Sequence, residues 1–196
     1  MPVPNHLETL FVPGRAEWRR WLSENHQVSP GVWLAICRKG GNQTCLSYDE
    51  AVEEALCFGW IDSKLNPLDQ DRYLLVFSPR RPKSPWSHLN KQRIEKLIGS
   101  GLMAPAGLEK IEAAKRDGSW TLIDAIEDLQ LPADLETAFS ADPAARQNFM
   151  AFSASARKQI LWWIESARRT ETRLKRIKET VELAGKNLKP GQDRRG

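Results

Sequence analysis

The sequence predicts an α+β fold: a small, mostly antiparallel sheet of at least three strands with packed helices, followed by an all-helical C-terminal segment. Residues 32–37 are apolar on both faces, which is typical of a strand covered on both sides. Residues 60–65 and 72–77 are predicted to be two further strands, and the turn residues 66–71 between them favour a hairpin. Beyond Trp120 the chain is predicted to be helical throughout, because its apolar residues recur at helical spacing.

The chain before the first buried strand is expected to hold a short edge strand and one helix. Residues 10–12 are apolar and suit the edge strand. A helix is predicted for residues 15–25, because Trp18, Trp21 and Leu22 recur at i, i+3 and i+4 and form one apolar face.

The next helix carries its own start and stop signals. Ser47 can cap its free N–H groups, and Glu50 stands at the spacing of a capping box. Gly59 suits the left-handed position that often follows a helix. The predicted buried stripe consists of Ala51, Val52, Ala55 and Leu56.

Capping residues and prolines delimit the helices after the hairpin. Ser87 is predicted to cap a helix at residues 88–100, and Pro105 to open another that ends near 116. The residues of the first of these helices predicted to face inward are Ile94, Leu97 and Ile98. Further helices are predicted at residues 122–129, 135–139, 143–152, 155–169 and 171–184.

Length and composition indicate an ordinary soluble globular protein. The 196 residues are 41% hydrophobic and 28% charged, with a net charge of +4. We expect an α+β domain at residues 1–128, a helical segment at 129–186 and a disordered basic tail at 187–196. The basic character is concentrated from residue 153 onward, where 12 Lys and Arg stand against 5 Asp and Glu. Such asymmetry suits a polyanion partner, although a basic stretch is more often a solvated helix face.

Three cysteines, Cys37, Cys45 and Cys57, show no C-x-x-C spacing, so free thiols and a cytoplasmic protein are expected. No secretory signal and no membrane span are expected either. The histidines share no ligand spacing with cysteines or carboxylates, so we expect no metal. We expect no cofactor, because phosphate-binding and dinucleotide-binding glycine motifs are absent.

The strongest candidate site is the proline-rich loop at residues 78–87. Three prolines restrict its backbone, so Arg80 and Arg81 are presented with less entropy to lose. The loop leads through Trp86 to Ser87, where the free N–H groups of a helix start favour an anion. The alternative interpretation is a surface loop in which Trp86 packs as a plug and the cations are solvated.

A second candidate is the alternation at Trp60 and Asp62, which points both side chains to one face of a strand. Asp62 beside a tryptophan suits a general base or a hydrogen-bond acceptor for a ligand. More often such an aspartate pairs with an arginine or caps a turn.

The last two helices are a third candidate, for nucleic acid. Cations follow phosphates and bases stack on aromatic rings, and Trp162 and Trp163 lie just upstream. The cations expected to serve this partner are Arg168, Arg169, Arg173 and Arg176. Against this interpretation, Leu174 and Ile177 belong to an apolar stripe that suits a core.

Several segments resemble one bacterial family. They are residues 47–63, 78–81, 86–90, 101–103, 105–107, 118–120 and 167–177, and the resemblance extends from about residue 18 to 184. Together they resemble the YdeI/OmpD-associated family, also called bacteriocin-protection proteins. The resemblance implies a link to protection from bacteriocins or antimicrobial peptides, and it implies no reaction.

The lead hypothesis is a cytoplasmic stress or bacteriocin-resistance protein that binds an anionic ligand without catalysis. One alternative is an enzyme acting on a phosphorylated or nucleotide-like small molecule in the same pocket, with Asp62 as its acid–base residue. The other is a nucleic-acid-binding protein that uses the basic C-terminal helices. The candidate ligand-binding residues are Trp60, Asp62, Arg80, Arg81, Trp86, Ser87 and Asn90.

Overall fold

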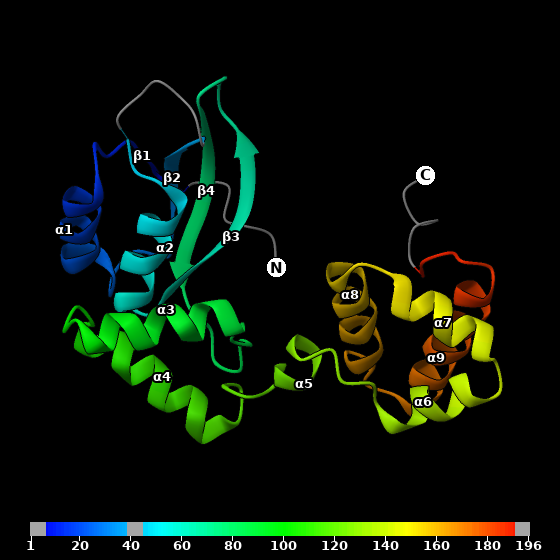
Figure 1. Cartoon of the computed structure of the whole chain (residues 1–196). Helices are drawn as coiled ribbons and strands as arrows, with labels where there is room; N and C mark the ends of the chain where they lie inside the picture. Colours follow the sequence, from blue (N-terminus) through cyan, green and yellow to red (C-terminus); the bar gives the residue numbers. More distant parts are fainter. Residues whose placement is uncertain (1–6, 39–44, 191–196) are drawn as a thin grey trace. The chain divides into compact units, whose positions relative to one another are not determined.

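The computed structural model describes residues 7–38 and 45–190. These residues form two compact units, one ending at Thr121 and the other beginning at Leu122. The part of the predicted basic tail at 191–196 lies outside the described residues. The first unit contains a sheet and helices, and the second is helical (Figure 1), so the predicted α+β class is confirmed.

The sheet of the first unit has four strands in the order β1-β2-β4-β3. Strand β2 pairs antiparallel with β4, and β4 pairs antiparallel with β3, whereas β1 runs parallel to β2. The strands are β1 (Thr9–Leu10), β2 (Val32–Cys37), β3 (Trp60–Pro67) and β4 (Arg72–Pro79).

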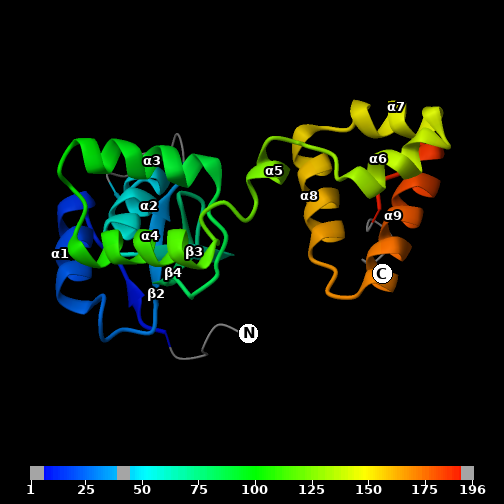
Figure 2. The same cartoon turned by 90° about the horizontal axis from the view of Figure 1, so that it is seen from below.

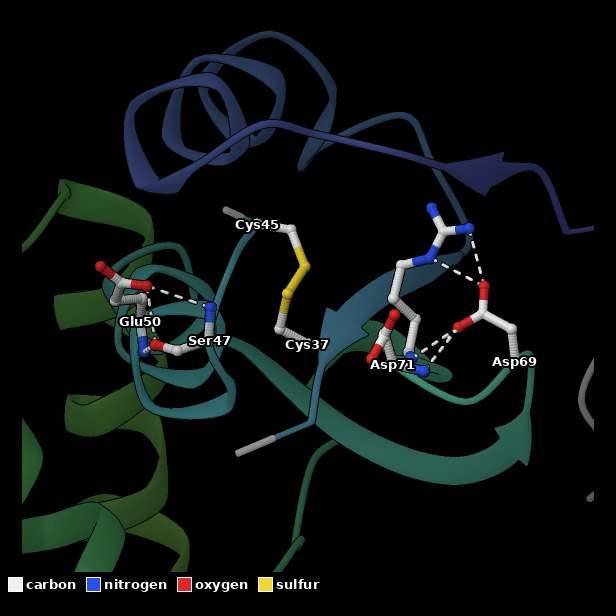
Figure 3. The surroundings of a disulfide bond; sticks show 7 residues. Cys37, Cys45, Ser47, Glu50, Asp69 and Asp71 are labelled. Atoms are coloured by element: carbon white, nitrogen blue, oxygen red, sulfur yellow. Dashed lines mark hydrogen bonds and ion pairs between the residues drawn. A yellow bond between two sulfur atoms is a disulfide. The ribbon is translucent and has the colours of Figure 1, made fainter. Parts of the chain in front are cut away.

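The predicted hairpin is formed by β3 and β4, each two residues longer than the sequence indicated. Asp69 organises its turn, because its carboxylate accepts hydrogen bonds from the backbone N–H of Asp71 and from the backbone and guanidinium of Arg72 (Figure 3). The register pairs Trp60 with Pro79. The start of β3 and the end of β4 therefore lie at the same end of the sheet, and Arg80 follows directly.

Helices α1 (Arg15–Asn25) and α2 (Tyr48–Cys57) enclose the main core with the sheet. The Trp18 ring packs at 5.5 Å from Phe77 of β4, and its indole N–H donates to the Ala51 carbonyl of α2. The predicted capping box is present, because Ser47 and Glu50 each accept a hydrogen bond from the other's backbone N–H.

Helices α3 (His88–Gly99) and α4 (Pro105–Asp117) both contact α2 (Figure 2). Gly107 sets how closely α4 approaches, because a Cβ atom there would lie 2.2 Å from the Cys57 carbonyl oxygen. The absence of a side chain at this position therefore lets α4 lie directly on the end of α2.

The second unit buries its own core of aromatic and branched residues, which includes Phe139, Phe149 and Ile164. No helix among the described residues is long and apolar enough to cross a membrane. The helices of this unit are α5 (Asp124–Glu127), α6 (Ala133–Ser140), α7 (Pro143–Ala151), α8 (Ala154–Glu165) and α9 (Thr170–Gly185).

Two predicted core positions are wrong. Ile98 is 50% exposed. The buried stripe of α3 runs through Ile94 and Leu97, and Ile98 lies about 100° around the helix from Leu97, at the edge of this stripe. Leu174 is 57% exposed, and the buried stripe of α9 begins only at Ile177, so Leu174 lies beyond the N-terminal end of that stripe.

The prediction of three free thiols is also wrong. Cys37 ends β2, Cys45 lies just before α2, and the two form a disulfide with their Cα atoms 5.8 Å apart (Figure 3). A backbone hydrogen bond from Cys37 to Leu46 joins the same two segments. The absence of C-x-x-C spacing did not reveal this pair, because the two cysteines are brought together only when the folded chain returns to β2. Cys57 is a free, buried thiol, and the cytoplasmic localisation stays a prediction.

Candidate functional site

Arg80 is buried at the point where β4 leaves the sheet, with 4% of its surface exposed. Its backbone N–H donates to the Gly59 carbonyl at 2.9 Å, which continues the pairing of the hairpin by one residue. Its guanidinium carbon lies 3.5 Å from the centre of the Trp86 ring, and Nη1 donates to the Pro85 carbonyl at 3.1 Å. The anion-site interpretation and the surface-loop interpretation both assumed that Arg80 is exposed, and its burial shows that this assumption is wrong.

The donors of Arg80 are only partly used. Its Nε–H is buried and finds no hydrogen-bond partner among the described residues. Desolvation lowers the Arg80 pKa from 12.5 to about 10, and the charge of Asp62 acts in the opposite direction. The guanidinium therefore stays charged at neutral pH, in surroundings that disfavour a charge.

A small pocket adjoins this guanidinium. We call it the Arg80 pocket; its volume is about 70 Å³. Its polar lining residues are Arg80, Arg81, Lys83, Lys110, Asp117 and Ser119. Its apolar lining residues are Pro82, Trp86, Ala113 and Ala114. Four cations and one carboxylate thus surround a space of this size, which makes it electropositive.

The glycine at position 59 brings one of these cations into place. Gly59 has φ +74°, and a Cβ atom there would lie 2.5 Å from Cγ of Lys110. The stem of Lys110 therefore passes over a position that has no side chain. The same glycine accepts the backbone hydrogen bond of Arg80, so it positions two of the four cations.

Asp117 anchors the loop to the end of α4. Its carboxylate accepts hydrogen bonds from the backbone N–H of Lys83 at 3.3 Å and of Ser119 at 2.9 Å. These hydrogen bonds, with Ser119 foremost, lower the pKa of Asp117. Lys83 is held with a positive φ of 61°, which is uncommon for a residue other than glycine. The carboxylate is thus ionised and occupied with holding the loop.

Three of the predicted site residues line the Arg80 pocket: Arg80, Arg81 and Trp86. Trp60 does not, because it is 1% exposed and belongs to the core, where its indole N–H donates to the His26 carbonyl at 3.2 Å. Ser87 caps α3, as predicted, by accepting a hydrogen bond from the backbone N–H of Asn90.

Asp62 and Asn90 belong to a neighbouring polar cluster outside the pocket lining. The Tyr48 hydroxyl donates to Asp62 at 3.3 Å. Arg93 donates to the Asn90 side-chain oxygen at 3.2 Å and pairs with Asp49. Asp62 therefore interacts with Arg80 electrostatically, whereas its hydrogen bond is with Tyr48.

The residues that α4 contributes to the pocket were not predicted from the sequence. Lys110, Ala113, Ala114 and Asp117 follow the i, i+3, i+4, i+7 spacing of one helix face. Trp120, just beyond α4, packs its ring 5.2 Å from that of Trp86. The face was visible in the sequence, but nothing in it assigned this face to the 78–87 loop.

The basic C-terminal helices use several of their cations within the second unit. Arg173 pairs with both Asp134 and Glu165, and Arg176 donates to the Trp163 carbonyl. Arg168 and Arg169 are exposed. An open groove of about 390 Å³ on this unit is lined by residues of both signs. Its lining residues are Trp163, Glu171, Thr172, Lys175, Arg176 and Glu179.

Comparison with protein families assigns each unit separately. Residues 10–110, just over half of the 196, match the model described as Domain of unknown function (DUF8412). The chain belongs to this family. The DUF8412 match contains both segments that carry the pocket cations, from Arg80 to Lys110, and stops short of Asp117.

Residues 128–187 match the model described as Bacteriocin-protection, YdeI or OmpD-Associated. This confirms the resemblance seen in the sequence for the helical part of the chain, and the segments at 47–63 and 78–90 lie in the DUF8412 range instead. No curated protein and no solved structure matches the chain. Within the described residues, no three His, Cys, Asp or Glu side chains are grouped as metal ligands would be.

Proposed function

We propose that the first unit binds a small oxyanion in the Arg80 pocket, and that it does so without catalysis. The observation that carries this proposal is the burial of Arg80 with an unpartnered Nε–H beside a cavity lined by three further cations. The second unit matches the bacteriocin-protection family. We therefore propose that the whole chain is a resistance-type protein that responds to an anionic ligand.

The energetics of Arg80 favour a ligand. Its pKa of about 10, against 12.5, corresponds to about 3 kcal/mol by which burial disfavours the charged form, at about 1.4 kcal/mol per pKa unit. Buried charges in proteins are normally paired. An anion in the pocket would supply the missing partner and accept from the planar fork of the guanidinium.

The contents of the pocket favour binding over catalysis. Asp117, its carboxylate, holds two backbone N–H groups and has a lowered pKa, so it is poorly suited to accept a proton near neutral pH. Asp62, which the enzyme hypothesis needs, lies outside the lining. The nucleic-acid hypothesis is less favoured, because Arg173 is already paired with two carboxylates.

The test compares the wild-type chain with Arg80→Met in the presence of phosphate. Methionine keeps an unbranched apolar stem and removes the charge, so the ligand-free variant should be as stable as the wild type or more stable. Phosphate at constant ionic strength should raise the melting temperature of the wild type and leave that of the variant unchanged. Arg146→Met, in the second unit, is the matched control and should respond like the wild type. An equal response of Arg80→Met would disprove the proposal.

A further inference from the structure

We infer that the ligand group of the Arg80 pocket is the terminal phosphate of a phosphate monoester. This inference rests on the anion binding proposed above and narrows it to one chemical class. Three properties of the pocket lead to it: its volume, the position of its opening, and the number of its charges.

The volume admits a single tetrahedral oxyanion and little more. The pocket, at about 70 Å³, is larger than the space of about 10–15 Å³ that one water molecule needs. A space of this size suits a small group such as a phosphate. Pockets that enclose a whole drug-sized molecule are larger, about 300–1,000 Å³. A nucleoside or a sugar attached to the phosphate must stay outside.

The exposed residues of the lining lie on the loop and on α4, and they indicate where the pocket opens. Arg80, Trp86 and Ser119 are buried and form the inner end, whereas Arg81 and Lys110 are exposed and form the rim. A terminal phosphate can enter past the rim and reach Arg80, and its one ester substituent then points outward. A phosphodiester carries two substituents, and a pocket of about 70 Å³ has less room for its more hindered phosphate.

The charges favour a dianion over a carboxylate. Arg80, Arg81, Lys83 and Lys110 outnumber Asp117 by three charges. A phosphate monoester carries nearly two negative charges at pH 7 and offers three strong acceptor oxygens. It can accept from Arg80 at the inner end and from rim cations at the same time. A carboxylate offers one charge and two oxygens, so it leaves more of the positive charge uncompensated.

The inference is tested by titration calorimetry of the full chain at pH 7.5 and constant ionic strength with four probes. These are inorganic phosphate, methyl phosphate, dimethyl phosphate and acetate. Inorganic phosphate and methyl phosphate should bind with Kd values within about threefold, and dimethyl phosphate and acetate at least about tenfold more weakly. Lowering the pH to 5.5 should weaken methyl phosphate binding about fourfold, because the dianion, with its pKa near 6, becomes the minority form.

Each other outcome has a distinct meaning. If no probe binds, the proposed anion binding itself is wrong. If acetate or dimethyl phosphate binds as tightly as methyl phosphate, anion binding stands and the monoester inference is overturned. The inference is also overturned if inorganic phosphate binds and methyl phosphate does not, since the pocket would then enclose a free ion.

A pair of lysine variants adds a second readout. Lys110→Gln should weaken methyl phosphate several-fold more than it weakens acetate, because a rim cation contributes most to the more highly charged ligand. Lys96→Gln, on α3 and outside the pocket lining, should leave the binding of both probes unchanged. Equal losses for both probes in Lys110→Gln would contradict the role given to the rim.

Discussion

The guanidinium carbon of Arg80 lies 3.5 Å from the centre of the Trp86 ring, a true stacking distance. The other cation–ring pairs within the described residues are 5.1 to 5.9 Å apart. A planar guanidinium can stack face to face on an indole, whereas an ammonium is a compact point charge. The position of Arg80 therefore depends on the shape of its head group as well as on its charge.

Arg80→Lys should lower phosphate affinity at least about tenfold, although it preserves the charge. Lysine loses both the stacking on Trp86 and the fork that binds two oxygens at once. Calorimetry with phosphate measures this loss. Arg81→Lys is the matched control, because Arg81 is exposed, and its affinity should change by less than about threefold. If Arg80→Lys binds phosphate within twofold of the wild type, charge alone determines binding.

Gly59→Ala should destabilise the first unit more than Gly101→Ala does. Both glycines have positive φ, +74° and +68°, so each alanine pays about 1 kcal/mol of backbone strain. At Gly59 the new Cβ also meets Lys110 at 2.5 Å, whereas at Gly101 nothing lies within 4 Å. The clash should add about 1–3 kcal/mol to the loss in free energy of unfolding, measured in urea.

The clash at Gly59 can be isolated by a double variant. Lys110→Ala removes the Cγ atom that the new Cβ would meet, so it should recover part of the loss in Gly59→Ala. It should recover nothing in Gly101→Ala. Additive losses in Gly59→Ala/Lys110→Ala would show that Lys110 moves aside at no cost.

The elements of the first unit were predictable because their signals are local. The capping box of Ser47 and Glu50 and the turn residues 66–71 of the hairpin specify structure within a few residues, and both are present. The helix boundaries agree within a few residues for the same reason.

The site was only partly predictable because it is made by packing between distant segments. The 78–87 loop was identified from its prolines and cations, and Arg80, Arg81 and Trp86 line the pocket. Alternation predicts that Trp60 and Asp62 point to one face of β3. It did not reveal that α1 covers this face, where the Trp60 and Trp21 rings meet at 5.8 Å. Lys110 reaches the pocket because Gly107 lets α4 approach α2, a close contact without a sequence pattern of its own.

Glu54→Gln should destabilise the first unit by about 2–3 kcal/mol. The Glu54 side chain is 2% exposed and accepts from Arg15 Nε and Arg19 Nη1, both at 2.6 Å. Removing one member of a buried ion pair leaves its partners uncompensated, which costs about 3–5 kcal/mol. Here the loss is smaller because about a third of each arginine side chain is exposed.

Glu53→Gln provides the comparison within the same helix. Glu53 also pairs with Arg15, but its side chain is 29% exposed, so its loss should stay below about 1 kcal/mol. Urea denaturation of both variants gives the two values. Equal losses would mean that burial of Glu54 adds nothing to the strength of its ion pairs.

Thiol counting in denaturant without reductant should find one free thiol, that of Cys57. The Cys37–Cys45 bond closes a short loop, with a sequence separation of 8, and should stabilise the chain by about 2.5 kcal/mol through loop-closure entropy. Cys45→Ser should therefore lose about this amount without reductant, and should match the wild type when both are reduced. A count of three thiols in protein purified without reductant would contradict the disulfide.

The two tyrosines of the chain should both titrate above the pH at which they titrate in the denatured state. Burial, and then the negative charge of Asp62, raise the pKa of Tyr48, and burial raises the pKa of Tyr73. A raised phenol pKa means that the fold favours the neutral form. The resulting stability is complete below about pH 10 and is lost as the pH rises through the folded-state pKa.

Absorbance of the phenolate measures both groups, with circular dichroism to confirm that the chain stays folded. Tyr48→Phe leaves Tyr73 alone and assigns the two steps. Asp62→Asn should then move the Tyr48 step to lower pH, because it removes the charge that opposes the phenolate at the other end of the 3.3 Å hydrogen bond. The Tyr73 step should move less, because the charge of Asp62 affects the pKa of Tyr73 less than burial and the charge of Arg38 do, whereas for Tyr48 it is second only to burial. An unchanged Tyr48 step in Asp62→Asn would show that the cluster around Asp62 is not formed as described.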